Sequence, residues 1–176
     1  MKRLLPLAFA CLILVVAGAV PAAGAKPSKA VSAADEQYLK TSIQGDLFEI
    51  IGGTWAQKHT KNAAVLRMAD RIVSDHTKSL KDAVKLARSL GIDVPGSPTP
   101  SEVWELKAVT SMRGRAYDHW YASLEVYDHV QDIQETTDEI NDGTNAKIRD
   151  DARTELPMLQ LHLKLARAAF AANPQA

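Results

Sequence analysis

The chain has 176 residues, of which 46% are hydrophobic, and its 21 Lys and Arg residues balance its 21 Asp and Glu residues. It therefore has no excess of basic side chains with which to bind the phosphates of a nucleic acid, and we expect no nucleic-acid partner. Its single cysteine, Cys11, excludes an intramolecular disulfide. A chain of this length is enough for one domain, so we expect stability to come from packing of a hydrophobic core.

The first 25 residues have the pattern of a secretory signal peptide. Lys2 and Arg3 precede an apolar run over residues 4–20, and small residues follow up to Ala25. We therefore predict cleavage after Ala25 and an exported protein, periplasmic or secreted. Cleavage would remove two basic and no acidic side chains, leaving 19 basic and 21 acidic ones. The alternative is an uncleaved membrane anchor, although the apolar run is short and Pro6 interrupts it.

Residues 26–31 form a predicted flexible leader, and residues 32–176 form one predicted all-α domain. Ser32 and Asp35 have the spacing of a helix capping box, and Gly91 is a typical helix stop. The Gly52-Gly53 pair indicates either a loosened helix or a close approach by a neighbour. Four long helices are predicted, over about Ala33–His59, Asn62–Leu90, Gly114–Asn141 and Asn145–Ala172.

The segment between the second and third long helices is proline-rich and then predicts a short helix, capped by Ser101. This connection is long enough to run back along the whole bundle. Two helical hairpins joined by one long crossover make a ferritin-like four-helix bundle, which is the fold that we predict. The alternative is a connection that folds locally as a lid over one end.

The seams of three predicted helices step by three and four residues, and each seam contains one histidine. Such steps place side chains on one face of a helix, here the face toward the bundle interior. The seams are Val65, Ala69, Ile72, His76, Leu80, Ala83, Ala87 and Leu90; Ala122, Val126, His129, Ile133, Thr136 and Ile140; and Ile148, Ala152, Glu155, Leu159, His162, Ala166 and Ala169.

The third long helix also has a second apolar side. It consists of Trp120, Leu124, Tyr127 and Val130, and we expect it to pack on the short connecting helix that contains Trp104.

His76, His129 and His162 all lie near the middle of their helices. Because the midpoints of bundled helices coincide whichever way the helices run, we expect the three imidazoles to meet at one depth. In the first helix, Glu49 lies at the same depth, on a stripe of small residues. A competing stripe through Leu39 and Ile43 leaves the direction of Glu49 open.

Three buried neutral imidazoles need hydrogen-bond partners or a metal ion to satisfy their lone pairs. His76, His129 and His162, with Glu49 as a fourth ligand, would suit a Zn, Cu or Fe ion. Asp75, Asp118, Tyr121 and Asp128 would then be polar neighbours that accept from, or pack around, the ligand rings. The alternative is a buried His/Asp/Glu hydrogen-bond network without metal.

Four stretches resemble, in this order, the motifs of a bacterial family of exported domains of unknown function, often labelled outer membrane proteins. They are QGDLFEI (residues 44–50), the Asp75-His76 pair, GRAYDHWY with Asp128-His129 after it, and LPMLQLHLKLA (residues 156–166). The resemblance covers nearly all of the chain after the signal peptide, and members are similar to ferritin-like bundles. It carries over to Glu49, Asp75, His76, Asp118, Tyr121, Asp128, His129, Pro157 and His162, but implies no settled activity.

Other kinds of site find little support in the sequence. No series of alternating ten-residue strands predicts a transmembrane barrel. A ferritin-type di-iron centre needs Glu three residues before each helical histidine, but Val73, Val126 and Leu159 occupy those positions. Motifs of hydrolases, metalloproteases and nucleotide-binding enzymes are missing, so catalysis is less expected than binding. A structural protein that binds an envelope component, or a homodimer, stays open, as does a mononuclear-metal enzyme by analogy with ferritin-like proteins.

Overall fold

The computed structural model describes residues 31–175, and all regular secondary structure in this range is helical. The predicted signal peptide, residues 26–30 of the predicted leader, and Cys11 lie outside the described residues. No helix within residues 31–175 is long and apolar enough to cross a membrane. The helices are α1 (Ala33–His59), α2 (Ala63–Leu90), α3 (Pro100–Thr110), α4 (Gly114–Asp142) and α5 (Ala146–Ala172).

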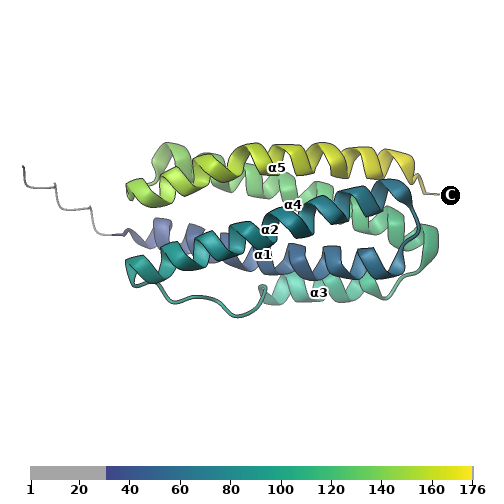
Figure 1. The fold of residues 1–176 in the computed structure, drawn as a ribbon, viewed down its shortest axis with the longest axis horizontal. Helices are drawn as coiled ribbons and strands as arrows, with labels where there is room; N and C mark the ends of the chain where they lie inside the picture. The colour runs from purple at the N-terminus through teal and green to yellow at the C-terminus, as the bar shows by residue number, and fades with distance from the viewer. Residues whose placement is uncertain (1–30, 176) are drawn as a thin grey trace, which may run out of the picture.

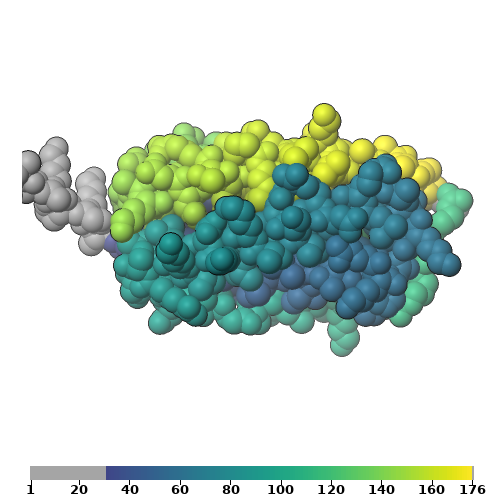
Figure 2. Space-filling view, viewed as in Figure 1, coloured from purple at the N-terminus to yellow at the C-terminus, as the bar shows by residue number. Residues whose placement is uncertain are grey.

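The four long helices lie side by side as a helical bundle (Figure 1). Helix α1 packs on α2, α4 packs on α5, and α2 also packs on α5, so that α2 and α5 together cover the face seen in Figure 2. In Figure 1, α2 ends at the left and α4 begins at the right, and residues 91–113 run between these ends along the outside of the other helices. Helix α3, in this segment, contacts α1 and α4.

Helix boundaries follow from side chains that cap the free backbone groups of the first turns. Ser32 and Asp35 form the predicted capping box of α1, and the Asn62 side chain accepts from the first backbone N–H groups of α2. Gly91 ends α2 with φ of 73°, a left-handed conformation that suits glycine. The prediction for α3 was wrong in its cap: Thr99, not Ser101, caps this helix, because Pro100 occupies its first turn.

The apolar core consists of two clusters, one toward each end of the bundle. One contains Ala56, Val65, Met68, Ala69, Ile72, Val109, Tyr117, Tyr121, Ala122, Ala166 and Ala169. The other contains Leu39, Ile43, Ala83, Ala87, Ile92 and Ile148. In α1, α2 and α5, the buried polar residues other than Asp35 fall between the two clusters along the helix. The centre of the bundle is therefore polar and lies between two apolar ends.

The expectation that the second apolar side of α4 packs on α3 is wrong, because three of its four residues are exposed. The side chain of Trp104 is 70% exposed, and Trp120, Tyr127 and Val130 are also exposed. Helix α3 instead buries Leu106 and Val109. Helix α3 thus has one buried face, with Leu106 and Val109, and one exposed face, with Val103 and Trp104. This is the usual pattern of a helix packed on the surface of a bundle.

The Gly52-Gly53 pair marks a close approach by neighbours and not a break, because α1 continues through it. A Cβ atom at Gly53 would lie 2.6 Å from Val73 Cγ2 and 3.3 Å from the carbonyl oxygen of Ala69. Alanine favours a helix over glycine by about 1 kcal/mol, but crowding of packed atoms costs about 1–3 kcal/mol. We expect Gly53→Ala to lower the free energy of unfolding by about 1 kcal/mol, as measured by urea denaturation.

Gly45 provides the matched control on the same helix. Within residues 31–175, no atom that packs against α1 at this point lies within 4 Å of a Cβ atom built at Gly45. Gly45→Ala is therefore expected to raise the free energy of unfolding by about 1 kcal/mol. If both substitutions changed the free energy of unfolding in the same direction, the packing argument for Gly53 would be contradicted.

Asp35 ties the start of α1 to the loop between α4 and α5. Its Oδ1 accepts from the backbone N–H of Thr144 at 2.7 Å, and its Oδ2 accepts from the Thr144 hydroxyl at 2.5 Å and from the backbone N–H of Ser32 at 3.0 Å. Because Asp35→Ala leaves three donors without their charged acceptor, we expect it to lower the free energy of unfolding by about 2 kcal/mol at neutral pH.

The effect of Asp35 should depend on pH. Burial alone would raise the pKa of Asp35, but the hydrogen bonds from Thr144 and Ser32 hold it well below its usual range. A depressed pKa stabilises the fold above the unfolded pKa of about 3.9, and this stabilisation is lost as the pH falls. Urea denaturation should therefore show the gap between wild type and Asp35→Ala narrowing between about pH 5 and pH 2. Glu36→Ala, which removes an exposed ion pair with Lys40, should show no such gap.

Candidate metal centre

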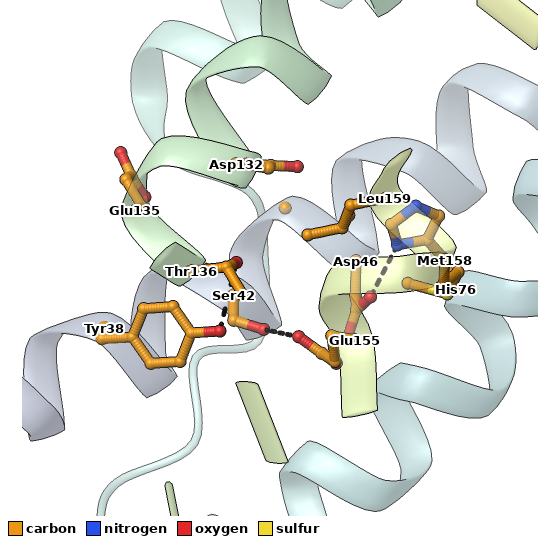
Figure 3. A pocket seen from close by; sticks show the side chains of 11 residues that line it. Tyr38, Ser42, Asp46, His76, Asp132, Glu135, Thr136, Glu155, Met158 and Leu159 are labelled. Atoms are coloured by element: carbon orange, nitrogen blue, oxygen red, sulfur yellow. Dashed lines mark hydrogen bonds and ion pairs between the residues drawn. The ribbon is translucent and has the colours of Figure 1, made fainter. Parts of the chain in front are cut away.

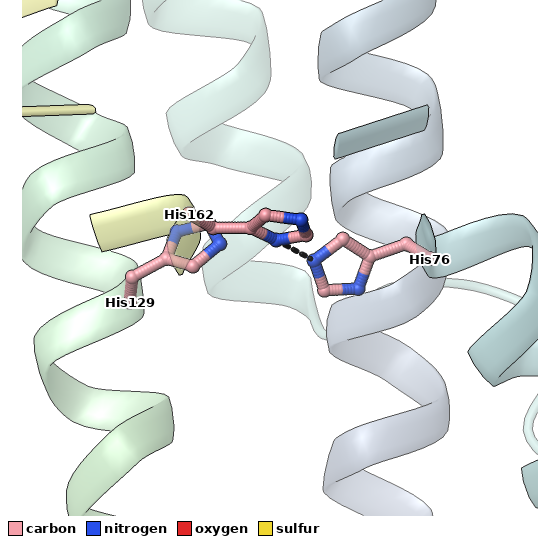
Figure 4. A group of neighbouring side chains, drawn as sticks. All are labelled: His76, His129 and His162. Atoms are coloured by element: carbon pink, nitrogen blue, oxygen red, sulfur yellow. Dashed lines mark hydrogen bonds between the residues drawn. The ribbon is translucent and has the colours of Figure 1, made fainter. Parts of the chain in front are cut away.

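Three imidazole rings, from α2, α4 and α5, meet in the polar centre of the bundle (Figure 4). The ring centroid of His76 lies 5.8 Å from that of His129 and 5.0 Å from that of His162, and the last two are 5.3 Å apart. All three side chains are buried. The convergence expected from their common depth is therefore confirmed, and the three ligand atoms that the rings can offer lie within 4.8 Å of one another.

Each ring has one nitrogen held by an oxygen outside the group. His76 Nδ1 lies 2.8 Å from Asp46 Oδ1. His162 Nε2 donates to Asp75 Oδ2 at 3.0 Å, and His129 Nδ1 donates to the backbone carbonyl of Glu125 at 2.9 Å. Such outer contacts fix which nitrogen of a ring is free to bind a metal ion.

The remaining nitrogens are turned toward the other rings. His76 Nε2 and His162 Nδ1 are 3.2 Å apart. His129 Nε2 has no hydrogen-bond partner among the described residues. Two nitrogens bound to one tetrahedral Zn²⁺ at its usual bond lengths would be about 3.3 Å apart, so the first two are already close to that separation. The donor set of three imidazoles suits Zn, Cu, Fe or Ni ions.

All three rings are neutral near pH 7, as metal ligands must be. Burial lowers the pKa of His76 to about 4. Burial and the neighbouring His76 lower the pKa of His162 to about 4 as well. Burial and the other two rings hold the pKa of His129 well below its usual range. Because the neutral form of each ring persists in weak acid, its lone pair stays available there.

Counting protons along the chain of contacts shows where one is held in the metal-free protein. The Asp75 carboxylate pairs with the Arg71 guanidinium at 2.5 Å and can only accept. The contacts Asp46–His76, His76–His162 and His162–Asp75 need three protons, of which two neutral rings supply two. Asp46 must supply the third, and burial indeed raises its pKa well above the usual range.

A small cavity reaches this proton-holding end of the chain (Figure 3). Its volume is about 20 Å³, enough for one water molecule. Asp46 lies between His76 and Glu155 there, and Ser42 donates to Glu155 Oε2 at 3.3 Å. Burial raises the pKa of Glu155 to about 8. A second proton is therefore held next to Asp46 near neutral pH.

Glu49 lies beside His129, but it does not join the three rings. Its Oε1 is 3.5 Å from His129 Nδ1, the nitrogen on the far side of the ring from His76 and His162. It groups instead with Asp128, and Glu125 is its other acidic neighbour. Glu49 is buried in the bundle, which settles the direction that the sequence left open, but its carboxyl group belongs to a separate acidic group.

The other predicted polar neighbours take different places. Asp75 accepts from His162, as a ligand-orienting acceptor would. Asp128 and Tyr121 lie with the acidic group beside His129. Asp118 accepts from the hydroxyl of Thr60 and takes no part in either group. The expectation for Asp118 was wrong because α4 places it about three turns from His129, toward the start of the helix.

Comparison with known protein families gives one match. A family model described as a domain of unknown function (DUF4142) matches residues 20–169. The chain belongs to this family. No curated protein matched the chain, and no solved structure matched it.

Two residues that contact the candidate site in this DUF4142 chain were not predicted as site residues. Asp46 contacts His76 from α1, and Glu125 supplies both a carbonyl to His129 and a buried carboxylate. The signal was available for both, because each lies about one helical turn before a predicted residue, Glu49 or His129, at the same depth of the bundle.

Proposed function

We propose that this member of the DUF4142 family is an exported protein with a ferritin-like bundle and a long crossover, which binds a transition-metal ion at His76, His129 and His162. The signal-like residues 1–25 support export, to the periplasm or beyond the cell. The path of residues 91–113 along the bundle supports the crossover.

One observation carries the metal proposal: every ring has its outer nitrogen held by an oxygen and its other nitrogen turned toward the group. A random cluster of core histidines has no reason to share this polarity, whereas metal-binding histidines nearly always have it. A water molecule or another small ligand would complete a four-coordinate Zn²⁺ site.

The test is zinc binding by untagged protein expressed from the full reading frame, measured by equilibrium dialysis and elemental analysis. We expect one zinc ion that depends on the three rings. His162→Ala should weaken zinc binding about a hundredfold or more, whereas His59→Ala, at an exposed histidine of α1, should leave it unchanged. Equal affinities in these two variants would reject the site.

A second candidate is a structural or partner-binding protein of the cell envelope whose polar centre only fixes the fold. The 3.2 Å contact between His76 and His162 favours it, because a hydrogen bond satisfies these two nitrogens without metal. The exposed Trp104 and Tyr127 offer apolar area for a partner or a second copy. This candidate predicts no zinc binding by wild type and no change in melting temperature when zinc is added.

A further inference from the structure

An acidic group lies on the opposite edge of the His129 ring from His76 and His162. It consists of Glu49, Glu125 and Asp128, on α1 and α4. Glu49 lies next to the other two carboxyl groups. The nearest oxygens of Glu49 and Glu125 lie 3.5 Å and 3.7 Å, respectively, from His129 Nδ1. The ligand atoms that Glu49, Asp128 and His129 can offer lie within 4.8 Å of one another.

The oxygens of this group lack the partners that buried carboxyl groups normally have. Glu49 and Glu125 are 0% exposed, and neither oxygen of either one has a hydrogen-bond partner within residues 31–175. Asp128 Oδ2 is also buried and, in the same part of the chain, unpartnered. Five buried acceptor oxygens without donors are costly for a folded protein unless protons or a cation satisfy them.

The side chain of Tyr121 also lies at this acidic group. Tyr121, one turn before Glu125 on α4, is 1% exposed, and its hydroxyl lies against the Glu125 carboxyl. Among the described residues this hydroxyl has no hydrogen-bond partner of good geometry. A tyrosine oxygen can complete a shell of oxygen ligands or donate to a carboxylate that is bound to a cation.

The ligand type separates this group from the three rings. Three carboxylates offer hard oxygen donors, which suit Mn²⁺, Mg²⁺ or Fe²⁺, whereas imidazoles favour Zn²⁺ and Cu²⁺. The His129 ring lies between the two, with Nε2 toward the rings and its Nδ1–H donating to the Glu125 carbonyl beside the acidic group. The two sets therefore share one ring without sharing a ligand atom.

We propose that Glu49, Glu125 and Asp128 bind a second divalent cation of the oxygen-preferring class, beside the transition-metal site formed by the three histidines. The pairing of the two ions rests on the proposed function, but the acidic site itself does not. A dication would neutralise carboxylates that burial otherwise forces to hold protons, since burial raises the pKa of Glu49 well above its usual range and that of Glu125 to about 7.

Manganese provides the probe, because free Mn²⁺ gives an electron paramagnetic resonance signal that is lost on binding. Untagged protein from the full reading frame is titrated with Mn²⁺ alone and again after one equivalent of Zn²⁺. We expect one Mn²⁺ per chain in both titrations. Asp128→Asn should weaken Mn²⁺ binding about tenfold or more and leave zinc affinity unchanged. Asp138→Asn, at an exposed position of α4, is the matched control.

A second variant guards against loss of the fold. Glu125→Gln removes a carboxylate and keeps the side-chain shape, so it should fold and still lose Mn²⁺. If wild type binds no Mn²⁺, or if Asp128→Asn binds it as tightly as Asp138→Asn, the acidic site is rejected, while zinc binding that depends on His162 would leave the proposed function standing. If instead the protein binds no zinc but binds Mn²⁺ in a way that depends on Asp128, the proposed function is rejected and the acidic site stands.

Discussion

Glu125→Gln is expected to stabilise the metal-free protein by about 3 kcal/mol at about pH 7.5, although it removes a side chain of the candidate cation site. Burial, with the charge of Asp128, raises the pKa of Glu125 to about 7, above the value of about 4.3 in an unfolded chain. An acid whose pKa rises on folding loses its proton more easily in the unfolded state. Its ionisation therefore destabilises the fold at pH values above the unfolded pKa.

The sign of this effect fixes its pH dependence. At about pH 4 the carboxyl group is protonated in both states, so the stability difference between wild type and Glu125→Gln should disappear. Urea denaturation in the presence of a chelator measures it at both pH values. Glu135→Gln, on the more exposed part of α4, is the control and should change stability little at either pH. A Glu125→Gln protein less stable than wild type at about pH 7.5 would mean that Glu125 has a charged partner.

Zinc binding is expected to release one proton per ion from the chain of contacts between Asp46 and Asp75. In the metal-free protein, the three contacts from Asp46 through His76 and His162 to Asp75 hold three protons, one of them on Asp46. Zinc takes the lone pairs of His76 Nε2 and His162 Nδ1, so the proton between them must leave, and the Asp46 proton moves to His76 Nδ1. Two protons then remain. Calorimetry in buffers of different ionisation enthalpy counts the released proton.

The number of protons released per zinc ion distinguishes the buried site from a site made of histidines with ordinary pKa values. Three imidazoles with the usual pKa of about 6.5 would release nearly three protons at about pH 5.5, and their zinc affinity would fall about ten-thousand-fold between pH 7 and pH 5. The lowered pKa values of His76 and His162, about 4, keep both rings neutral over this range. One released proton per zinc ion means a fall of about tenfold per pH unit, or about a hundredfold in all.

Asp46→Asn identifies the source of the proton. An asparagine in this place has no acidic proton to give, so the variant should bind zinc with release of none, and about tenfold more weakly than wild type. His59→Ala should behave as wild type in both respects. A release of two or three protons by wild type at about pH 5.5 would contradict the assignment of protons to this chain.

The helices could be predicted closely because their signals are local. Capping side chains, glycine stops and the three-and-four step of apolar residues act within a few turns, and these set the bounds of α1 and α2. The cap of α3 was missed because two adjacent residues, Thr99 and Ser101, are both good caps. The exposure of Trp104 and Tyr127 could not be predicted, since it depends on how α3 is rotated against α1 and α4.

The depth of site residues could likewise be predicted, but their partners could not. Their equal depth along the helices predicts that His76, His129 and His162 meet, as they do. Which carboxylate faces which nitrogen depends on helix rotations of a few tens of degrees and on rotamers, which a periodic pattern does not contain. For this reason the periodic pattern predicts Glu49 as a fourth ligand beside the three rings and does not indicate the contact between Asp46 and His76.

Helix α5, the last helix of the described residues, carries the third histidine of the group. Its position determines when during folding a metal ion can bind. Because His162 lies on α5, which packs against α2 and α4, a folding intermediate that lacks α5 has only two of the three rings. A metal ion that needs all three can join only a nearly finished fold. The bound ion would then stabilise the packing of α5 only after the transition state of folding, so it would slow unfolding many-fold and leave the rate of folding unchanged.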